Sequence, residues 1–314
     1  MARAILLLPE GAAFGAQRLP AATAKRLGRA DVATGLDPGR RAQLRRHFAL
    51  PANAWPIAAL SRQADVGDAA GAVWLRADPA YLRPDINGVR LLAHGDALPV
   101  GAADAGALLP ALKPLFGDAG MLLDAPVPGR WYLRLPVGAR VPDFSDPGEA
   151  LGADLFDHVA TGDEGRRWRT LAGEAQIALH NHPWNAQRSA SGKLPVNALW
   201  FWGGGALPAT RHVTAPRYDA VFGGEPTLHA LASEPGSLAL PQAFEPVAGD
   251  ALYDLASMRD LAALDRDWLQ PALGALASGR IDQLELDGQD GVVRTLRPRQ
   301  GWRIWRRPVA SLGA

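Results

Sequence analysis

The sequence predicts an α/β fold, built on a mostly parallel sheet that is flanked by helices. Residues 4–8 (AILLL) form a continuous apolar run, which is typical of a strand buried on both faces of a parallel sheet. Residues 196–202 (VNALWFW) suit a second buried strand, and a run of three glycines follows it. Between these strands, apolar residues recur at helical spacing from Trp168 to Leu179 and form one stripe.

The length and composition are those of an ordinary globular chain. Its 314 residues suffice for one large domain or two smaller ones, and 48% of them are hydrophobic, which allows a sizeable core. The formal net charge of +1 provides no global field that would attract nucleic acid or an anionic membrane. There is no cysteine, which excludes disulfides, thiolate nucleophiles and cysteine-ligated zinc.

The first residues do not resemble a targeting signal. The apolar run at residues 4–8 is too short for the core of a signal peptide, and Pro9-Glu10 ends it. No apolar run approaches the length of a membrane span. We therefore expect a soluble, cytoplasmic protein that does not associate with a membrane.

Apolar periodicity and turn residues divide the rest of the chain into further elements. The expected helices lie at residues 23–50 (interrupted at 37–39), 101–120 and 261–275. The expected strands lie at residues 73–75, 89–92, 131–135, 220–222, 237–240, 281–286, 292–296 and 302–307. Asp78-Pro79 should form a turn, and Pro183 should end the helix that precedes it.

Several charged residues each allow two interpretations. Glu10 follows the first strand where its carboxyl end emerges, so it is either a site carboxylate or an ordinary exposed turn residue. The arginine pairs at 40–41 and 45–46 either contact phosphates or form a solvated helix face. Arg76 and Asp78 either help to position an anion or satisfy one another in an ion-pair network.

The most distinctive stretch runs from residue 174 to residue 208. It combines imidazoles, carboxamides, an arginine, tryptophans and a glycine run within about one tenth of the chain. Arginine and lysine side chains can hold a carboxylate or a phosphate here, with asparagine side chains as neutral donors. The predicted ligand-binding residues are Arg76, Asp78, His180, His182, Asn185, Arg188, Asn197, Trp200 and Gly203.

Metal chemistry and nucleophilic catalysis have less support. His180 and His182 lie two residues apart, which puts both imidazoles on one side only in an extended segment, and a zinc site still needs a third ligand. The glycines at 203–205 lack the Lys-Ser/Thr of a P-loop and the spacing of a dinucleotide fingerprint, and no GxSxG motif is present. We therefore predict no catalytic residue, no metal site and no cofactor.

Arginines and two tryptophans cluster near the end of the sequence, between Arg294 and Arg307. Side chains of these types can follow and stack on single-stranded nucleic acid. A basic edge strand that resists pairing with another sheet is the interpretation that we prefer.

The distinctive stretch resembles a known family motif. His182-Pro-Trp-Asn185, Arg188, Gly192-Lys193, Pro195 and the run from Asn197 to Gly205 resemble a segment of the archaeal-type, cofactor-independent phosphoglycerate mutases, which belong to the alkaline phosphatase superfamily. Residues 5–11 are similar to the first strand of that family, and residues 264–276 are similar to its helix before the last metal-binding segment. The whole chain also looks like a bacterial family labelled as phosphoglycerate mutases or as regulatory proteins of the RpfE type.

The resemblance implies an alkaline-phosphatase-like core with an inserted, smaller α+β region. The core would comprise residues 1–70 and 210–314, and the insertion, residues 71–209, would bind the ligand. Family mutases use two metals, held by Asp and His residues, and a serine that carries the phosphoryl group. Here Glu10 stands in place of the first metal-binding Asp, no Gly-Ser-Asp segment follows it, and no Asp-His pair follows the last helix.

These departures remove most of the groups that two-step phosphoryl transfer requires. We therefore expect a degenerate, mutase-like pseudoenzyme with a regulatory or accessory role, which binds a small acidic or phosphorylated ligand or a protein partner. Two alternatives remain open. One is an active metal-dependent phosphotransferase or phosphohydrolase with a rearranged site around His180, His182 and Glu10, and the other is a nucleic-acid-associated protein that uses the C-terminal Arg/Trp cluster.

Overall fold

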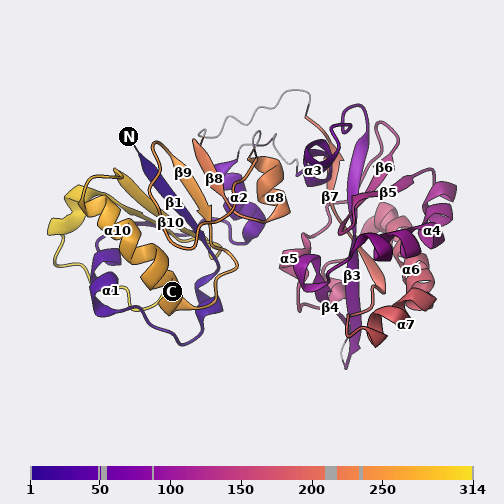
Figure 1. Cartoon of the computed structure of the whole chain (residues 1–314), viewed down its shortest axis with the longest axis horizontal. Coiled ribbons are helices and arrows are strands. Elements are labelled where there is room, and N and C mark those ends of the chain that lie inside the picture. The colour runs from indigo at the N-terminus through magenta and orange to yellow at the C-terminus, as the bar shows by residue number, and fades with distance from the viewer. Residues whose placement is uncertain are drawn as a thin grey trace. The chain divides into compact units, whose positions relative to one another are not determined.

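The computed structural model describes residues 2–48, 50, 55–86, 88–208, 218–232 and 236–312. The chain forms two compact units (Figure 1). Unit 1 comprises Met1–Leu50 and Val213–Ala314, and unit 2 comprises Pro51–His212. In the described part of the chain, no helix combines the length and the apolar character needed to cross a bilayer.

Unit 1 contains a six-stranded sheet in the order β2-β11-β10-β1-β9-β8. The strands are β1 (Arg3–Leu8), β2 (Asp31–Ala33), β8 (Ala220–Phe222), β9 (Ala251–Asp254), β10 (Gln283–Gly288) and β11 (Val293–Leu296). β1 lies between β9 and β10 and is parallel to both, and β8 is parallel to β9. β11 and β2 extend the sheet with antiparallel pairs. The predicted α/β fold with a mostly parallel sheet and flanking helices is confirmed.

The helices of unit 1 follow its strands in sequence. They are α1 (Ala21–Leu27), α2 (Arg40–His47), α8 (Pro226–Leu231), α9 (Leu261–Leu264) and α10 (Gln270–Ala277), with a π-helical turn at Asp265–Leu269 between the last two. Because side chains alternate across a strand, Leu6 and Leu8 of β1 share one face, where they join Leu27 of α1 and Leu273 of α10 in the main core.

Unit 2 is built around a five-stranded antiparallel sheet. Its strands are β3 (Val73–Asp85), β4 (Gly88–His94), β5 (Leu122–Val127), β6 (Arg130–Leu135) and β7 (Ala198–Ala206). Its helices are α3 (Ile57–Asp65), α4 (Ala102–Asp118), α5 (Pro147–Ala150), α6 (Gly162–His180) and α7 (Pro183–Ala190). The long strand β3 is the centre of the sheet, since it pairs with β4, β6 and β7.

The turn predicted at Asp78-Pro79 is wrong. Asp78-Pro79 lies inside β3, where Pro79 pairs with Leu199 of β7, while the pairing of β3 with β6 ends at Arg76. A proline is tolerated in a strand that has a partner on one side only at that position. The helix before Pro183 does end as predicted, since α6 stops at His180. Pro183 then begins a new helix, α7, because the fixed φ of proline suits the first position of a helix.

Three further differences concern short segments. Residues 237–240 form only an isolated bridge at Leu238, and residues 298–302 form a 3-10 turn where the last strand was expected to begin. The four-residue strand β9 was not predicted, because its sequence (ALYD) is too short to show periodicity. It becomes a strand through its pairing with β1 and β8.

The glycine run at 203–205 lies within β7 rather than beyond its end. Gly203 has a φ of 65°, and a Cβ added there would lie 3.1 Å from Cβ of Ile57 and 3.3 Å from the backbone nitrogen of Ala58. The absence of a side chain therefore allows the start of α3 to approach β7 closely.

We predict that Gly203→Ala destabilises unit 2 by about 1–3 kcal/mol, because the new methyl group meets α3 and the left-handed φ disfavours alanine. Urea unfolding of the full chain, followed by tryptophan fluorescence, measures the effect. Gly173→Ala in α6 is the matched control, since a Cβ there meets open space and alanine favours the helix by up to about 1 kcal/mol. Equal stability of the two variants would contradict the close approach.

Candidate functional site

Acidic side chains gather at the carboxyl ends of the parallel strands of unit 1. Asp254 ends β9, and Asp287 is the penultimate residue of β10. Both are register partners of Leu7 in β1, so the two aspartates flank the central strand from either side. The carboxyl edge of a parallel sheet is where ligands bind in open α/β folds, which makes this edge the candidate site.

Helix α2 supplies a guanidinium group to each aspartate. Nη2 of Arg40 lies 2.6 Å from Oδ2 of Asp254 and 3.7 Å from Oε2 of Glu225. Arg46 forms a bidentate pair with Asp287, with Nε 2.9 Å from Oδ2 and Nη2 2.6 Å from Oδ1. Such two-pronged pairs are the strongest of the charge-assisted hydrogen bonds between side chains.

A buried glutamine fixes the helix against the strand ends. The side-chain amide of Gln43, with 0% relative exposure, donates to the carbonyl oxygens of Leu8 (2.9 Å) and Asp287 (2.6 Å). Its own oxygen accepts a hydrogen bond from Nη1 of Arg40 at 2.8 Å. Gln43 thereby satisfies two strand-end carbonyls and holds Arg40 in place.

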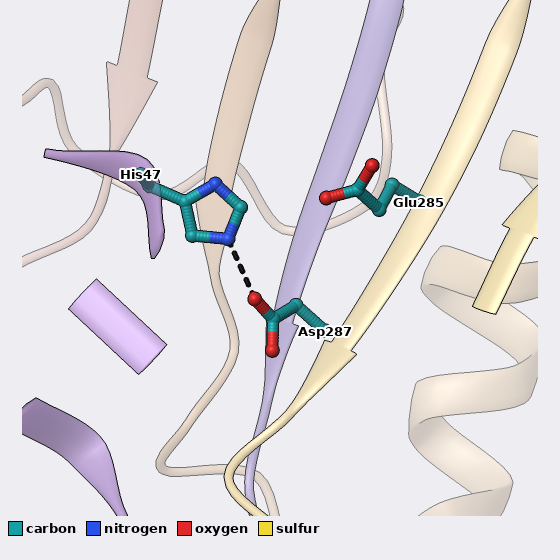
Figure 2. A group of neighbouring side chains, drawn as sticks. All are labelled: His47, Glu285 and Asp287. Atoms are coloured by element: carbon teal, nitrogen blue, oxygen red, sulfur yellow. Dashed lines mark hydrogen bonds and ion pairs between the residues drawn. The ribbon is translucent and has the colours of Figure 1, made fainter. Parts of the chain in front are cut away.

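The last residue of α2, His47, completes the cluster (Figure 2). Its Nε2 lies 2.7 Å from Oδ2 of Asp287, and its Nδ1 lies 2.8 Å from the hydroxyl of Tyr218. Glu285 is two residues before Asp287 on β10, and its carboxylate points to the same side of the strand as that of Asp287. Ligand atoms of His47, Glu285 and Asp287 all lie within 4.8 Å of one another.

The surroundings shift the pKa values of three groups in different directions. Burial alone would raise the pKa of Asp287, but the hydrogen bonds and charges of His47 and Arg46 outweigh it and hold the pKa below its usual value. Burial raises the pKa of Asp254, and the charge of Arg40 offsets only part of this rise. Burial, with the charge of Glu285, raises the pKa of the Tyr218 hydroxyl, so this group remains a donor.

The donor set of His47, Glu285 and Asp287 would suit a divalent metal by residue type. The hydrogen bonds that Asp287 and His47 already make do not suit a metal ion. Both oxygens of Asp287 already accept bonds from Arg46 or His47, and both nitrogens of His47 have partners. A metal would have to displace the guanidinium of Arg46, which itself carries the positive charge that the carboxylate requires. In this arrangement the cluster neutralises itself and does not fit a metal ion.

Sequence reasoning did not single out this cluster. The sequence allows Arg40 and Arg46 to be either phosphate contacts or part of a solvated helix face, and the structure pairs both with aspartates instead. Asp254 was missed because β9 was missed. The available signal was the six-residue spacing of Arg40 and Arg46 on a helix, together with an Asp at the end of two strands that flank β1.

Glu10 also lies at this edge, directly after β1. Its side chain is exposed, as the interpretation of an ordinary turn residue expects. The nine residues predicted to bind a ligand belong to unit 2.

The first two, Arg76 and Asp78, form a buried ion pair on β3, with Nη2 2.8 Å from Oδ2. Asp78 also accepts hydrogen bonds from the backbone N–H of Trp131 (3.2 Å) and from the indole of Trp202 (2.8 Å). Arg76 donates to the hydroxyl of Ser61 at 3.3 Å. These contacts agree with the alternative of a self-satisfying network, and ligand binding by the pair stays a prediction.

Asn185 joins α7 to the segments on both sides of it. Its amide nitrogen donates to the carbonyls of Leu179 (2.7 Å) and Val196 (2.8 Å), and its oxygen accepts from the N–H of Val196 (2.9 Å). The side chain is buried, so these bonds replace those that water would otherwise make. Asn185 is therefore a clamp between the end of α6 and the start of β7.

Arg188 of α7 is a second clamp and is 2% exposed. Its guanidinium lies 2.7 Å from Asp104 and donates to the carbonyls of Leu194 (2.9 Å) and Pro99 (3.1 Å). Burial would raise the pKa of Asp104, but hydrogen bonds from the Gly101 backbone, an indole and Arg188 hold the pKa below its usual value.

The other predicted residues occupy mixed positions. Asn197 bridges β7 and β3 through two hydrogen bonds with the backbone of Leu82, at 2.7 and 2.8 Å. The indole of Trp200 donates to the carbonyl of Ser145 at 2.9 Å. His180 is exposed at the end of α6, and His182 caps α7 by accepting the N–H of Trp184 at 3.2 Å. His180 is thus exposed, His182 and Asn197 are half-buried, and Trp200 is buried.

Comparison with known proteins finds similarity to phosphoglycerate mutases over part of the chain. Over 62 residues it is 34% identical to a probable 2,3-bisphosphoglycerate-independent phosphoglycerate mutase of Geobacter sulfurreducens, covering 20% of this chain and 16% of that protein. Over 77 residues it is 30% identical to the 2,3-bisphosphoglycerate-independent enzyme of Methanothrix thermoacetophila, covering 24% and 18%. No protein-family profile matches the chain.

A solved structure of a cofactor-independent phosphoglycerate mutase from Thermoplasma acidophilum aligns with 94% of this chain and 89% of that one, with a TM-score of 0.43 and 18% identity. The sequence matches span less than one fifth of the curated relatives, at 16% and 18% of their lengths. A segment of the chain is thus related to cofactor-independent phosphoglycerate mutases.

We predict that Asn185→Ala lowers the free energy of unfolding by roughly 2–4 kcal/mol, because it leaves a buried N–H and two buried carbonyls without their partner. Chemical unfolding of the full chain measures this loss. The control is His180→Ala, which removes an exposed side chain and should change stability by less than about 0.5 kcal/mol. A small effect of Asn185→Ala would contradict its role as a clamp.

Asp287 should make unit 1 sensitive to acid. Its folded-state pKa lies below the unfolded value of about 3.9, so its stabilising effect is present above that value and is lost as the pH falls through the folded pKa. Asp287→Asn should cost roughly 2–4 kcal/mol at neutral pH and flatten the dependence of Tm on pH below about pH 5.

The comparison variant is Asp267→Asn, whose aspartate pairs with Arg266 at the surface. Its melting curves should follow those of the wild type across the same pH range, since exposed pairs contribute little. If Asp287→Asn retained the full acid sensitivity of the wild type, the pairing of Asp287 with Arg46 and His47 would not be its source.

Proposed function

We propose that this chain is a degenerate phosphoglycerate mutase-like protein with an alkaline-phosphatase-like core and a regulatory or accessory role. In this proposal it binds a small phosphorylated acid or a protein partner and does not transfer a phosphoryl group through bound metals. The partial sequence similarity to cofactor-independent mutases supports the relationship. The RpfE-type regulatory proteins, which the sequence resembles, provide the model for the role.

One observation carries the proposal. At the strand ends of unit 1, the carboxylates on either side of β1 form ion pairs with arginines: Asp254 pairs with Arg40, and Asp287 pairs with Arg46. Metal-dependent phosphoryl transfer needs such carboxylates free to hold cations that neutralise the phosphoryl oxygens. In its bidentate pair, the guanidinium of Arg46 compensates the charge of Asp287 but leaves this carboxylate no free site at which to coordinate a metal ion.

Five of the nine proposed ligand-binding residues, from His180 to Asn197, lie in α7 or close to it in the sequence. Asn185, Arg188 and Asn197 use their polar groups to hold the backbone, so their part in binding would be to shape the region. His180 and His182 reach solvent, and Lys193 is exposed after α7. These three side chains are the ones that would contact a phosphate or carboxylate directly.

A second candidate is a metal-dependent phosphohydrolase. It is favoured by the three potential ligands His47, Glu285 and Asp287, whose atoms lie within 4.8 Å of one another. In this case Arg46 would have to leave Asp287 when the metal binds. The first candidate is better supported because it requires no such rearrangement.

We predict that calorimetry of the full chain with 2- and 3-phosphoglycerate detects binding without added metal, while mutase activity stays absent with Mn²⁺ or Zn²⁺. His182→Ala combined with Lys193→Ala should weaken the binding by about tenfold, since it removes charge-assisted contacts. Gln187→Ala, an exposed change on the same helix, is the control and should bind as the wild type does.

Two outcomes would overturn the proposal. Absence of heat with either phosphoglycerate would eliminate the small-ligand version. Turnover that depends on added metal and is lost in His47→Ala would establish the phosphohydrolase candidate instead, because His47 belongs to unit 1 and has no place in the binding of ligand near α7.

A further inference from the structure

Three large apolar side chains are exposed together near the end of unit 1. Trp302, Ile304 and Trp305 are 66%, 77% and 62% exposed. The other eight tryptophans of the chain are buried or half-buried. Single exposed apolar residues are common on protein surfaces, but a contiguous group of this kind marks an interaction site.

The segment that carries them, residues 298–312, is a fixed strap and not a loose tail. It passes the end of α1 so closely that a Cβ added at Gly28 would collide with the backbone carbonyl of Arg307. The N–H of Val309 donates to the carbonyl of Ala24 (2.9 Å), and the carbonyl of Ala310 accepts from the N–H of Leu19 (2.9 Å). Leu312 is buried in the main core of unit 1 and anchors the strap there.

A buried polar residue fixes the other end of the strap. The side chain of Gln300 donates to Asp31 at 2.7 Å and accepts from the backbone N–H of Arg297 at 3.0 Å. The rings of Trp302 and Trp305 pack edge to face, with their centroids 4.9 Å apart. The apolar group is therefore held in an exposed position by its own backbone and by buried contacts.

The strap is strongly basic. Residues 298–312 contain four arginines and no acidic residue, and Arg297 directly precedes them. Asp31, which lies beside the strap, forms ion pairs with Arg297 and Arg303 and accepts a hydrogen bond from Gln300. Within the described part of the chain, the exposed side chains of Arg299, Arg306 and Arg307 have no hydrogen-bonded or ion-paired partner. Their charge is therefore available to an anionic partner.

We propose that the strap binds the surface of an anionic lipid bilayer. Tryptophan favours the headgroup region, where its ring is in an apolar environment and its N–H remains hydrated, and arginine can extend to lipid phosphates while its stem lies along apolar groups. Each basic residue near an anionic membrane adds to the attraction. The low net charge of the whole chain does not oppose this, because adsorption depends on the local charge within about a Debye length.

Single-stranded nucleic acid is the competing partner, and two features argue against it. Ile304, the most exposed of the three apolar side chains, is aliphatic and offers no ring for a base to stack on. The two indoles are inclined at 60° to one another and are in contact, so they do not present parallel platforms for successive bases. An apolar boundary flanked by phosphates accommodates all three side chains.

The test is flotation of the full chain with vesicles of phosphatidylcholine mixed with phosphatidylserine, compared with vesicles of phosphatidylcholine alone. We predict binding to the anionic vesicles only. Trp302→Ser with Trp305→Ser should weaken it by at least about tenfold, through loss of interfacial anchoring. Replacing Arg299, Arg306 and Arg307 by Gln should weaken it by on the order of a hundredfold.

The matched control is Phe156→Ser, which removes a side chain of similar exposure, 69%, from unit 2 and should leave binding unchanged. Since all of the changed residues are exposed, unaltered melting curves should show that each variant is folded. Failure to float with either vesicle, or equal binding by the Trp302/Trp305 variant, would overturn the proposal. So would tryptophan-dependent binding to a single-stranded oligonucleotide without binding to vesicles. None of these three outcomes affects phosphoglycerate binding near α7, which is a separate measurement.

Discussion

The pairing of guanidinium groups with carboxylates at the carboxyl end of the unit 1 sheet is the interaction on which the rest of that unit depends. Parallel pairing puts Asp254 and Asp287 beside the same residue of β1, and the second of these is fully buried. Two unpaired carboxylates there would be expensive to remove from water. Arg40 and Arg46 compensate both charges, and their positions on one helix fix α2 over the strand ends.

Unit 2 uses the same principle around a different element. Arg188 on α7 pairs with Asp104 on α4 and donates to two backbone carbonyls, and Asn185 joins the residues on either side of the helix. These residues belong to the stretch that resembles the mutase segment. Their polar groups hold α7 between α6 and β7, so in this structure the two side chains act on the scaffold of unit 2.

The elements that could be predicted from the sequence are those whose local pattern agrees with their tertiary setting. The apolar run that becomes β1 and the residues that become α4 and β6 are examples. The turn expected at Pro79 is wrong because a strand tolerates a proline where it has a partner on one side only, and this depends on which strands pair with β3. The strand β9 is not predictable because its pairing, and not its own four residues, makes it a strand. The pairing of Arg46 with Asp287 joins residues 241 positions apart, and only the folded topology brings them together.

Two arginine-containing regions of unit 1, the strand ends and the strap, differ in whether their arginines are paired. The chain is almost neutral overall, and at the strand ends of unit 1 the arginines are used internally, in bonds that leave them little freedom to bind a ligand. On the strap the reverse holds, since Arg299, Arg306 and Arg307 are exposed beside three apolar side chains that the fold holds in solvent. The position of these arginines beside an exposed tryptophan pair is explained by a partner that carries both negative charge and an apolar boundary.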